Sequence, residues 1–373
     1  MKQYKMLALL SALALLFSLA ACESGLDAPT NGPTQEATAS VPPTGEPSAE
    51  PGGTPSLADD EKPDIRLAVL SGPTGIGAAK LLNDEDNGPG LLRASYDYSI
   101  YTDNSELVAG LTQGKIDIAT MASNVAVNLY NKTRGNRDRG DVMIIAAGTL
   151  GVLHILEGNG GDTIHTVADL RGKTIYCAGQ GANPEYILRH LLQKSDLEVG
   201  TDVKVVFSDA AEISAKLLSG DIECAMLPVP AATAAIAKGE GKVRAAIDVT
   251  EAWDALRSGS QLIMTAVVAR TEFVEEHPEL VDAFLADYEE SINYVNHNID
   301  AAAELVAHYN ITPSAAIAKQ AIPQCHLAFL SGSDMVSALS GYFVTLYAID
   351  PNSLGDPASG GGVPSDGIYY VAR

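Results

Sequence analysis

The sequence predicts an α/β protein of two similar lobes, each a mostly parallel sheet flanked by helices. Beyond residue 64, short apolar segments alternate with helical segments, which is typical of parallel strands joined by helical crossovers. The chain has 373 residues, enough for two lobes with separate cores. A weak internal repeat also relates the two parts of this region to each other.

The expected elements follow the apolar pattern along the chain. In the first part we expect strands at residues 65–70, 96–101, 116–120 and 142–147, and helices at 75–82, 105–113 and 123–131. In the second part we expect strands at 173–177, 203–207, 222–227 and 243–247, and helices at 184–194, 211–218 and 231–238. A strand at 263–268 opens a mostly helical remainder, in which apolar residues at helical spacing predict one buried face: Val281, Phe284, Leu285, Tyr288, Ile292 and Val295.

The internal repeat matches residues 111–119, LTQGKIDIA, with residues 217–225, LLSGDIECA. In each copy a helix ends at a glycine, and an acidic residue follows the first apolar residue of the next strand. The two parts therefore share one strand–turn–helix plan. Two similar α/β lobes predict a ligand cleft between them.

The amino-terminal segment indicates secretion and a lipid anchor. Lys2 and Lys5 precede an apolar run that ends in small residues before Cys22, so residues 1–21 read as a lipoprotein signal peptide and Cys22 as the acylated residue. A permanent membrane helix is the alternative, but the run is short for one. Residues 22–63 are rich in Pro, Thr and Ser and cannot bury a core, which predicts a disordered tether. The domain would then be held at the outer face of the cell membrane.

The remaining chain divides into two lobes by its pattern. We assign residues 64–150 and 263–373 to lobe 1 and residues 151–262 to lobe 2. The formal net charge of −23, with no cluster of Lys or Arg, argues against nucleic-acid binding. Cys177, Cys224 and Cys325 are expected to be buried free thiols, with one disulfide as the alternative.

Catalytic and metal-binding patterns do not emerge from the sequence. The seven histidines are dispersed, without the spacing of metal ligands, and no Gly-x-Ser-x-Gly elbow occurs. Residues 71–80 invite comparison with a phosphate loop, but Gly77 is followed by Ala78 where a lysine is needed. The dinucleotide fingerprint also fails, because Lys80 stands where a small residue is needed. We therefore expect no enzyme activity, cofactor or metal.

Glycine-rich turns after the predicted strands are the candidate ligand site. At such turns the backbone N–H groups and the dipole of the following helix point toward the cleft, and glycines let a ligand come close. The alternative is that these turns are purely structural. The candidate ligand-binding residues are Ser71, Gly72, Pro73, Thr74, Ser123, Asn124, Thr149, His154, Gly179, Gln180, Gly181, Ala182, Asn183, Glu185, Pro228 and Trp253.

Several of these candidates have a structural explanation of their own. Ser123 and Asn124 are good helix N-caps. Glu185 is placed to cap the helix that Pro184 opens. His154 follows the expected crossover at residues 150–152 and is either a cleft residue or a satisfied structural histidine. Trp253, the single tryptophan, either covers a ligand ring or packs beneath a loop.

At this point the chain resembles a known family. Residues 65–75, 114–119, 169–175, 181–186 and 227–230 are similar to segments of ABC-transporter substrate-binding proteins. The most similar group is the type II class, with nitrate-, sulfonate- and taurine-binding proteins and the NMT1/THI5-like pyrimidine binders. This resemblance implies the type II periplasmic-binding-protein fold, two hinged lobes and a monomer that delivers its solute to an ABC permease and its ATPase.

The resemblance leaves the solute open. Helix N-termini favour a small polar or anionic solute. A heteroaromatic solute such as a thiamine-precursor pyrimidine is the rival, with Trp253, Tyr176 and Tyr186 as stacking surfaces. The cysteine-rich motif of the enzyme members of the pyrimidine group does not occur here, which argues against pyrimidine synthesis. The same scaffold would also suit a secreted enzyme or a sensory lipoprotein, since a fold does not settle a function.

Overall fold

The structure is a computed structural model, and it describes residues 64–371 except 89, 136 and 258. The predicted signal peptide, the tether and Cys22 lie outside the described residues. Among the described helices, none is both long and apolar enough to cross a membrane.

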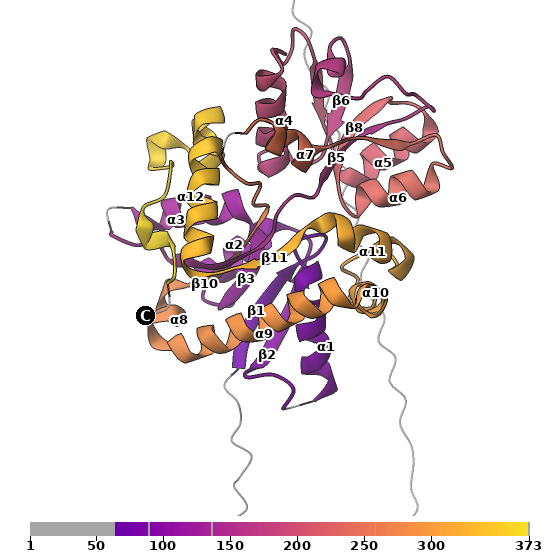
Figure 1. Cartoon of the computed structure of the whole chain (residues 1–373). Coiled ribbons are helices and arrows are strands. Elements are labelled where there is room, and N and C mark those ends of the chain that lie inside the picture. The colour runs from indigo at the N-terminus through magenta and orange to yellow at the C-terminus, as the bar shows by residue number, and fades with distance from the viewer. Residues whose placement is uncertain (1–63, 89, 136, 258, 372–373) are drawn as a thin grey trace, which may run out of the picture. The chain divides into compact units, whose positions relative to one another are not determined.

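The first sheet has the strand order β11-β4-β10-β3-β1-β2 (Figure 1). Its strands are β1 (Asp64–Leu70), β2 (Ser95–Tyr101), β3 (Ile118–Ala122), β4 (Val142–Thr149), β10 (Thr265–Arg270) and β11 (Leu327–Leu330). Strand β1 runs parallel to β2 and β3, and β10 runs antiparallel to β3 and β4. Strand β11 is antiparallel to β4.

The second sheet has the order β7-β6-β8-β5-β9. Its strands are β5 (Leu153–Glu157), β6 (Thr174–Cys177), β7 (Lys204–Phe207), β8 (Cys224–Pro228) and β9 (Arg244–Asp248). Strand β6 is parallel to β7 and β8, whereas β5 is antiparallel to β8 and β9. We call residues 64–150 and 263–371, which hold the first sheet, the first half, and residues 151–262, which hold the second sheet, the second half.

The expected α/β class is confirmed, but the sheets are mixed rather than mostly parallel. The physical reason lies in the two crossovers between the sheets. The first residue of β5, Leu153, pairs with the last residue of β8, Pro228. The first residue of β10, Thr265, likewise pairs with the last residue of β3, Ala122. Each crossover thus enters its new sheet at the edge where the parallel strands end, so the entering strand has to run the other way.

Helices cover both sheets. They are α1 (Ala79–Asn87), α2 (Asn104–Thr112), α3 (Ser123–Arg134), α4 (Asn183–Lys194), α5 (Ala210–Ser219), α6 (Ala231–Lys238), α7 (Val249–Ala255), α8 (Thr271–Glu276), α9 (Pro278–His297), α10 (Ile299–His308), α11 (Ala315–Ala321) and α12 (Gly332–Ile349). Short 3₁₀ helices lie at Ile76–Ala78, Val167–Leu170, Ile322–Cys325, Pro351–Leu354, Pro357–Ser359 and Asp366–Ile368.

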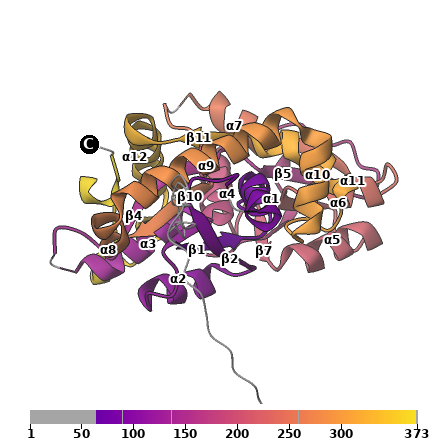
Figure 2. The same ribbon diagram turned by 90° about the horizontal axis from the view of Figure 1, so that it is seen from below.

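Helix α9 carries the predicted apolar stripe. Val281, Phe284, Tyr288, Ile292 and Val295 are buried, while Leu285 is half-buried. The helix packs against α1 and runs across the first sheet (Figures 1 and 2). The stripe is therefore core packing, as its spacing predicts.

The internal repeat has a structural counterpart. Its two glycines, Gly114 and Gly220, both have positive φ angles, +68° and +85°, at the turns that lead to β3 and β8. Strand β3 lies between β1 and the antiparallel β10, and β8 lies between β6 and the antiparallel β5. The two copies thus occupy equivalent places in the two sheets.

The three described cysteines are free and buried, as expected. Cys177 and Cys224 lie on adjacent strands, β6 and β8, without a disulfide between them. Burial raises the pKa of each of the three thiols to about 12. The thiols are therefore protonated near neutral pH and unreactive.

The two halves also touch through helices. Helix α12 packs on β4 of the first half and contacts α4 of the second half. Helix α11 of the first half contacts α6 of the second, and Figure 2 shows α11 beside α6.

Candidate functional site

The turn after β1 forms one side of the candidate site. Ser71, Gly72, Pro73 and Thr74 are all half-buried. Gly72 has a φ of +82°, and its N–H donates to the Ile311 carbonyl at 3.1 Å. A Cβ at Gly75 would lie 2.4 Å from the Leu70 carbonyl oxygen, so only glycine allows the chain to turn so tightly after the strand.

Hydroxyl groups connect this turn to the neighbouring strands. Thr74 and Thr265 hold each other by a hydrogen bond between their hydroxyls at 3.3 Å. The Leu70 N–H donates to the Thr120 hydroxyl at 3.1 Å. Thr120 and Thr265 are fully buried. Sequence reasoning missed both, although each is a threonine in a strand that reaches this edge of the first sheet.

Ser123 and Asn124, at the start of α3, are fully buried. The N-cap of this helix is Ala122, with no side-chain cap. The Ser123 hydroxyl instead donates to the Ile263 carbonyl at 2.5 Å, and its N–H donates to the Met264 carbonyl at 3.1 Å. The N-cap interpretation of these two residues is therefore wrong: Ser123 holds the second crossover against α3.

The turn after β6 begins with exposed residues and ends with a buried one. Gly179, Gln180 and Gly181 are exposed, Ala182 is half-buried, and Asn183 is fully buried at the start of α4. Gly179 and Gly181 have positive φ angles, +94° and +71°.

Glu185 serves its own helix. Its carboxylate accepts from the Gly181 N–H at 2.9 Å, and the Arg189 guanidinium pairs with it at 2.7 Å. The N-cap of α4 is Ala182, without a side-chain cap, so Glu185 accepts from the residue before the N-cap and does not form the expected capping box.

The two turns meet between the halves. The Asn183 amide donates to the Ser123 hydroxyl at 3.0 Å and to the Met264 carbonyl at 3.3 Å. The Asn124 amide donates to the Gly181 carbonyl at 3.4 Å. Candidates from widely separated segments of the sequence are thus in direct contact, and the amino ends of α3 and α4 lie side by side.

Two further candidates, Thr149 and Pro228, lie at or beside the first crossover. The Thr149 carbonyl accepts from the Met264 N–H at 2.8 Å, and the Thr149 side chain is buried. Pro228 is half-buried at the end of β8, opposite the start of β5. Thr149 and Pro228 therefore lie where the chain passes between the sheets.

His154 is the second residue of β5 and pairs with Asp248 of β9. Burial lowers the pKa of its imidazole, and the nearby Asp248 carboxylate opposes this shift. The imidazole Nδ1 is buried with no hydrogen-bond partner among the described residues. His154 is thus neutral near pH 7 and lies next to the first crossover.

Trp253 packs in the interior, so our expectation of a ligand contact is corrected. Its ring is 0% exposed, and its indole N–H donates to the Ser260 carbonyl at 2.9 Å. The ring lies 4.9 Å from His190 of α4 and 6.1 Å from Tyr342 of α12, centroid to centroid. The residue joins α4, α7 and α12 because its large apolar surface is best buried there.

Neither of the two tyrosines named as stacking surfaces is exposed. Tyr186 is buried on α4, and burial is the main cause of its raised pKa. Tyr176 is half-buried on β6, with the Lys216 ammonium 5.7 Å from its ring. Neither ring is exposed enough to offer an open stacking face.

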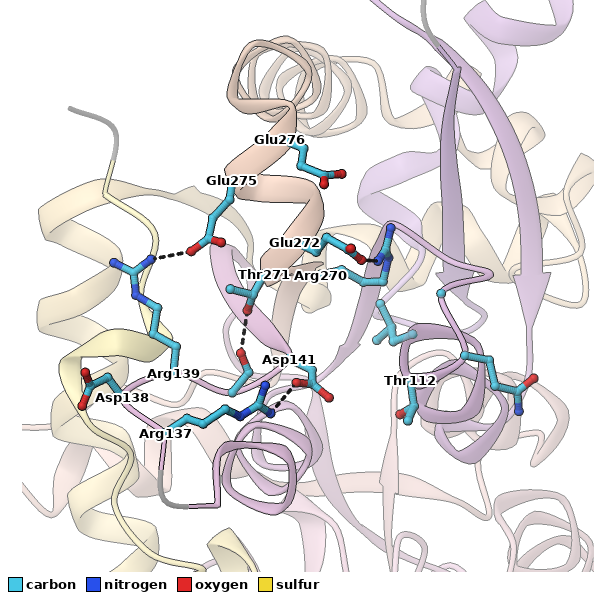
Figure 3. A pocket seen from close by; sticks show the side chains of 14 residues that line it. Thr112, Arg137, Asp138, Arg139, Asp141, Arg270, Thr271, Glu272, Glu275 and Glu276 are labelled. Carbon is cyan, nitrogen blue, oxygen red and sulfur yellow. Dashed lines mark hydrogen bonds and ion pairs between the residues drawn. The ribbon is translucent and has the colours of Figure 1, made fainter.

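A separate hollow of about 1020 Å³ lies at the opposite end of the first sheet (Figure 3). Its three arginines are each paired with a carboxylate: Arg137 with Asp141, Arg139 with Glu275, and Arg270 with Glu272. These guanidinium groups are already neutralised, so the hollow offers an incoming anion little. In the part of the chain that the structure describes, no three His, Cys, Asp or Glu side chains are placed to hold a metal ion.

Comparisons with known proteins identify the fold. Residues 149–302 match the family model described as NMT1/THI5 like. No curated protein matches the chain.

Among solved structures, an ABC transporter from Parabacteroides distasonis aligns with a TM-score of 0.67 and 22% identity over 83% of this chain and 99% of its own. The periplasmic aliphatic sulphonate binding protein SsuA from Escherichia coli aligns with a TM-score of 0.62 and 16% identity, over 83% and 94%. The alkanesulfonate-binding protein SsuA from Xanthomonas axonopodis pv. citri, bound to MOPS, aligns with a TM-score of 0.59 and 15% identity. The alignment covers 80% of this chain and 98% of that protein.

The strand after each crossover, β10 in the first half and β5 in the second, is antiparallel to both of its neighbours. The described chain has the type II periplasmic-binding-protein fold, and its residues 149–302 are similar to the NMT1/THI5 like family.

Proposed function

We propose that this chain is the extracytoplasmic solute-binding component of an ABC importer, and that it captures a small polar or anionic solute between its two halves. The observation that carries the proposal is the pair of contacts across the halves, Asn183 with Ser123 and Asn124 with Gly181. Similar folds include binding proteins for sulfonates, which supports a transport role.

The chemistry of the meeting point fits reversible capture. It offers amides, hydroxyls and the amino ends of two twelve-residue helices, α3 and α4. Its one ionised candidate, Glu185, is matched by Arg189. Binding would thus rest on hydrogen bonds and helix dipoles rather than on ion pairs, and it should depend weakly on salt.

Opening and closing would use the two crossovers. The contacts between α3 and α4 form only when the halves come together, so a solute that bridges them favours the closed form by its differential affinity. The closed form would then dock on a permease. We propose no chemical step. Mass spectrometry of the solute recovered from the protein should therefore give the same mass as the solute that was added.

We also propose that Cys22 is lipidated and that residues 22–63 tether the domain to the membrane. The support is the apolar run and small residues before Cys22. Metabolic labelling with a radioactive fatty acid should label the chain, and Cys22→Ser should abolish the label. Equal labelling of both would exclude this anchor.

A heteroaromatic solute is the second candidate. The NMT1/THI5-like match over residues 149–302 favours it. The buried positions of Trp253 and Tyr186 do not supply a stacking surface, so such a solute would be held by its ring nitrogens and amino groups.

A thermal-shift screen tests the proposed function. The purified chain is heated with oxyanions, sulfonates, amino acids or pyrimidines, and a solute that binds the folded state raises the melting temperature by mass action. A rise with one class that is smaller in Asn183→Ala supports the proposal. If compounds from every class leave the melting temperature unchanged, the solute-binding role is wrong.

A further inference from the structure

We infer that the solute donates hydrogen bonds to the side-chain carbonyl oxygens of Asn124 and Asn183, so that a donor group is a requirement of the site. The inference rests on the proposed function and goes beyond it, because it states what chemistry the solute must carry.

The orientation of the two amides is fixed by their partners. The Asn124 Nδ2 group donates to the Gly181 carbonyl, and the Asn183 Nδ2 group donates to the Met264 carbonyl. A backbone carbonyl can only accept, so the atom facing it has to be the amide nitrogen. Neither amide can be turned over without placing oxygen against oxygen. The positions of the two Oδ1 atoms follow from this.

The two amide oxygens are buried and unsatisfied. Both side chains are 0% exposed, and neither Oδ1 atom has a hydrogen-bond partner among the described residues. Buried polar groups are almost always satisfied, and an amide oxygen has two acceptor sites. Each Oδ1 shares its amide carbon with a nitrogen that reaches the other half, so both oxygens lie where the halves meet. This site is short of hydrogen-bond donors.

Three neighbouring donors are already engaged. The Ser123 hydroxyl, which accepts from Asn183, donates to the Ile263 carbonyl. The Ser123 N–H donates to Met264, and the Gly181 N–H donates to Glu185. The missing donors therefore have to come from a bound molecule. A solute with N–H or O–H groups fits, and an oxyanion that can only accept does not satisfy these two atoms.

Matched pairs of solutes test this inference on the unaltered full chain by isothermal titration calorimetry. The pairs are ethanesulfonate with 2-aminoethanesulfonate, acetate with glycine, and pyrimidine with 4-aminopyrimidine. In the pair whose scaffold fits, the donor-bearing member should bind about tenfold more tightly or better, which is the worth of one or two satisfied hydrogen bonds. Equal affinity, or tighter binding of the donor-free member, would overturn the inference and leave the solute-binding role intact.

The variant Asn124→Ala, with its control Asn128→Ala, adds a second readout. Asn128 also has a buried Oδ1 without a partner among the described residues, but it lies one turn further along α3 and faces Gly355, where a Cβ would come within 2.7 Å of it. The affinity ratio within the binding pair should fall toward one in Asn124→Ala and stay unchanged in Asn128→Ala. A ratio unchanged in both variants overturns the assignment to Asn124. An absence of heat with every compound would overturn the solute-binding role, and the donor requirement with it.

Discussion

The Asn183 side-chain amide of the second half donates to the Ser123 hydroxyl of the first half across 3.0 Å, and both residues are fully buried. Asn183 starts the helix after β6, and Ser123 starts the helix after β3. One hydrogen bond therefore joins equivalent edges of two sheets that are built on the same plan.

This contact predicts the effect of Asn183→Ala. The Ser123 hydroxyl and the Met264 carbonyl both keep another partner after the change, so the free energy of unfolding should fall by no more than about 1–2 kcal/mol. Solute affinity should fall about tenfold, because the closed form loses two hydrogen bonds between the halves. Calorimetric titration and denaturant unfolding measure the two effects. The exposed α9 residue Asn293 provides the control Asn293→Ala, which should change neither. A large loss of stability with unchanged affinity would contradict this role.

The first crossover packs tightly against α7 at Gly151. A Cβ there would lie 1.8 Å from the Thr250 hydroxyl oxygen and within 2.9 Å of two further Thr250 side-chain atoms. Gly151→Ala should therefore lower the free energy of unfolding by about 1–3 kcal/mol through overpacking, as denaturant unfolding would measure.

A double-mutant cycle checks the cause. Thr250→Gly alone costs about 0.5 kcal/mol or less in helix propensity, because threonine is itself a weaker helix former than alanine. Because it removes all three close atoms, it should rescue most of the Gly151→Ala loss in the double variant. Additive losses would show that the strain has another origin.

Asp117 ties three strands together at the far end of the first sheet. Its carboxylate accepts from the Arg66 N–H at 3.1 Å and Nε at 2.7 Å, and from the Arg270 guanidinium at 3.1 Å. Burial alone would raise the pKa of Asp117, but these hydrogen bonds outweigh it and lower the pKa. Asp117→Asn should lower the free energy of unfolding by about 2 kcal/mol at pH 7, because the Arg66 guanidinium loses its charged partner and Arg270 keeps only Glu272.

The repeat supplies the matched control. Glu223 holds the equivalent place before β8 and is exposed, so Glu223→Gln should change the unfolding free energy by less than about 0.5 kcal/mol. Because the Asp117 pKa is depressed in the folded state, its contribution is present above the unfolded pKa of about 3.9 and is lost as the pH falls below it. The difference in the free energy of unfolding between the unaltered chain and Asp117→Asn should thus become smaller as the pH falls toward about 3. If this difference does not change with pH, the Asp117 carboxylate does not stabilise the fold through its charge.

Two buried histidines predict a loss of stability in mild acid. Burial lowers the pKa of His154, and burial together with Lys194 lowers that of His190, whose two ring nitrogens lack hydrogen-bond partners among the described residues. The unfolded imidazole titrates near about 6.5, so below this pH the unfolded chain binds more protons and unfolding becomes easier.

Denaturant unfolding at about pH 7.5 and about pH 5.5, on either side of the unfolded imidazole pKa, measures this effect. The free energy of unfolding should be lower at the acidic pH, and the difference should shrink in the variant His190→Phe, which keeps a ring beside Trp253. If the loss of stability in mild acid is as large in His190→Phe as in the unaltered chain, groups other than His190 cause it.

The apolar pattern predicted most elements but missed two strands, β5 and β11. Strand β5 has the sequence LHILE, and its buried polar residues, His154 and Glu157, interrupt the apolar run. The buried Glu157 carboxylate accepts hydrogen bonds from the Arg244 guanidinium and the Thr163 hydroxyl. Burial would raise the pKa of Glu157, but its hydrogen bonds lower it to about 2. Strand β11 has four residues, too few for a clear pattern. Neither strand could be placed by periodicity alone.

The candidate site could be predicted only in part, for a related reason. Sequence reasoning named Ser123, Asn124 and Asn183 as polar residues at helix starts, but their contacts depend on how the two halves meet. The Met264 and Gly181 carbonyls have no side-chain signal, so the sequence could not reveal them. Trp253 is equally ambiguous in sequence, because a large ring suits a ligand or a core, and only the positions of His190 and Tyr342 decide for the core.

The most direct test of solute capture between the halves is a crystal structure of the chain with a stabilising solute from the thermal-shift screen. We expect density at the meeting point of α3 and α4, within hydrogen-bond distance of residues from both halves. Density confined to one half, or to the hollow lined by Arg137 and Arg270, would contradict solute capture between the halves.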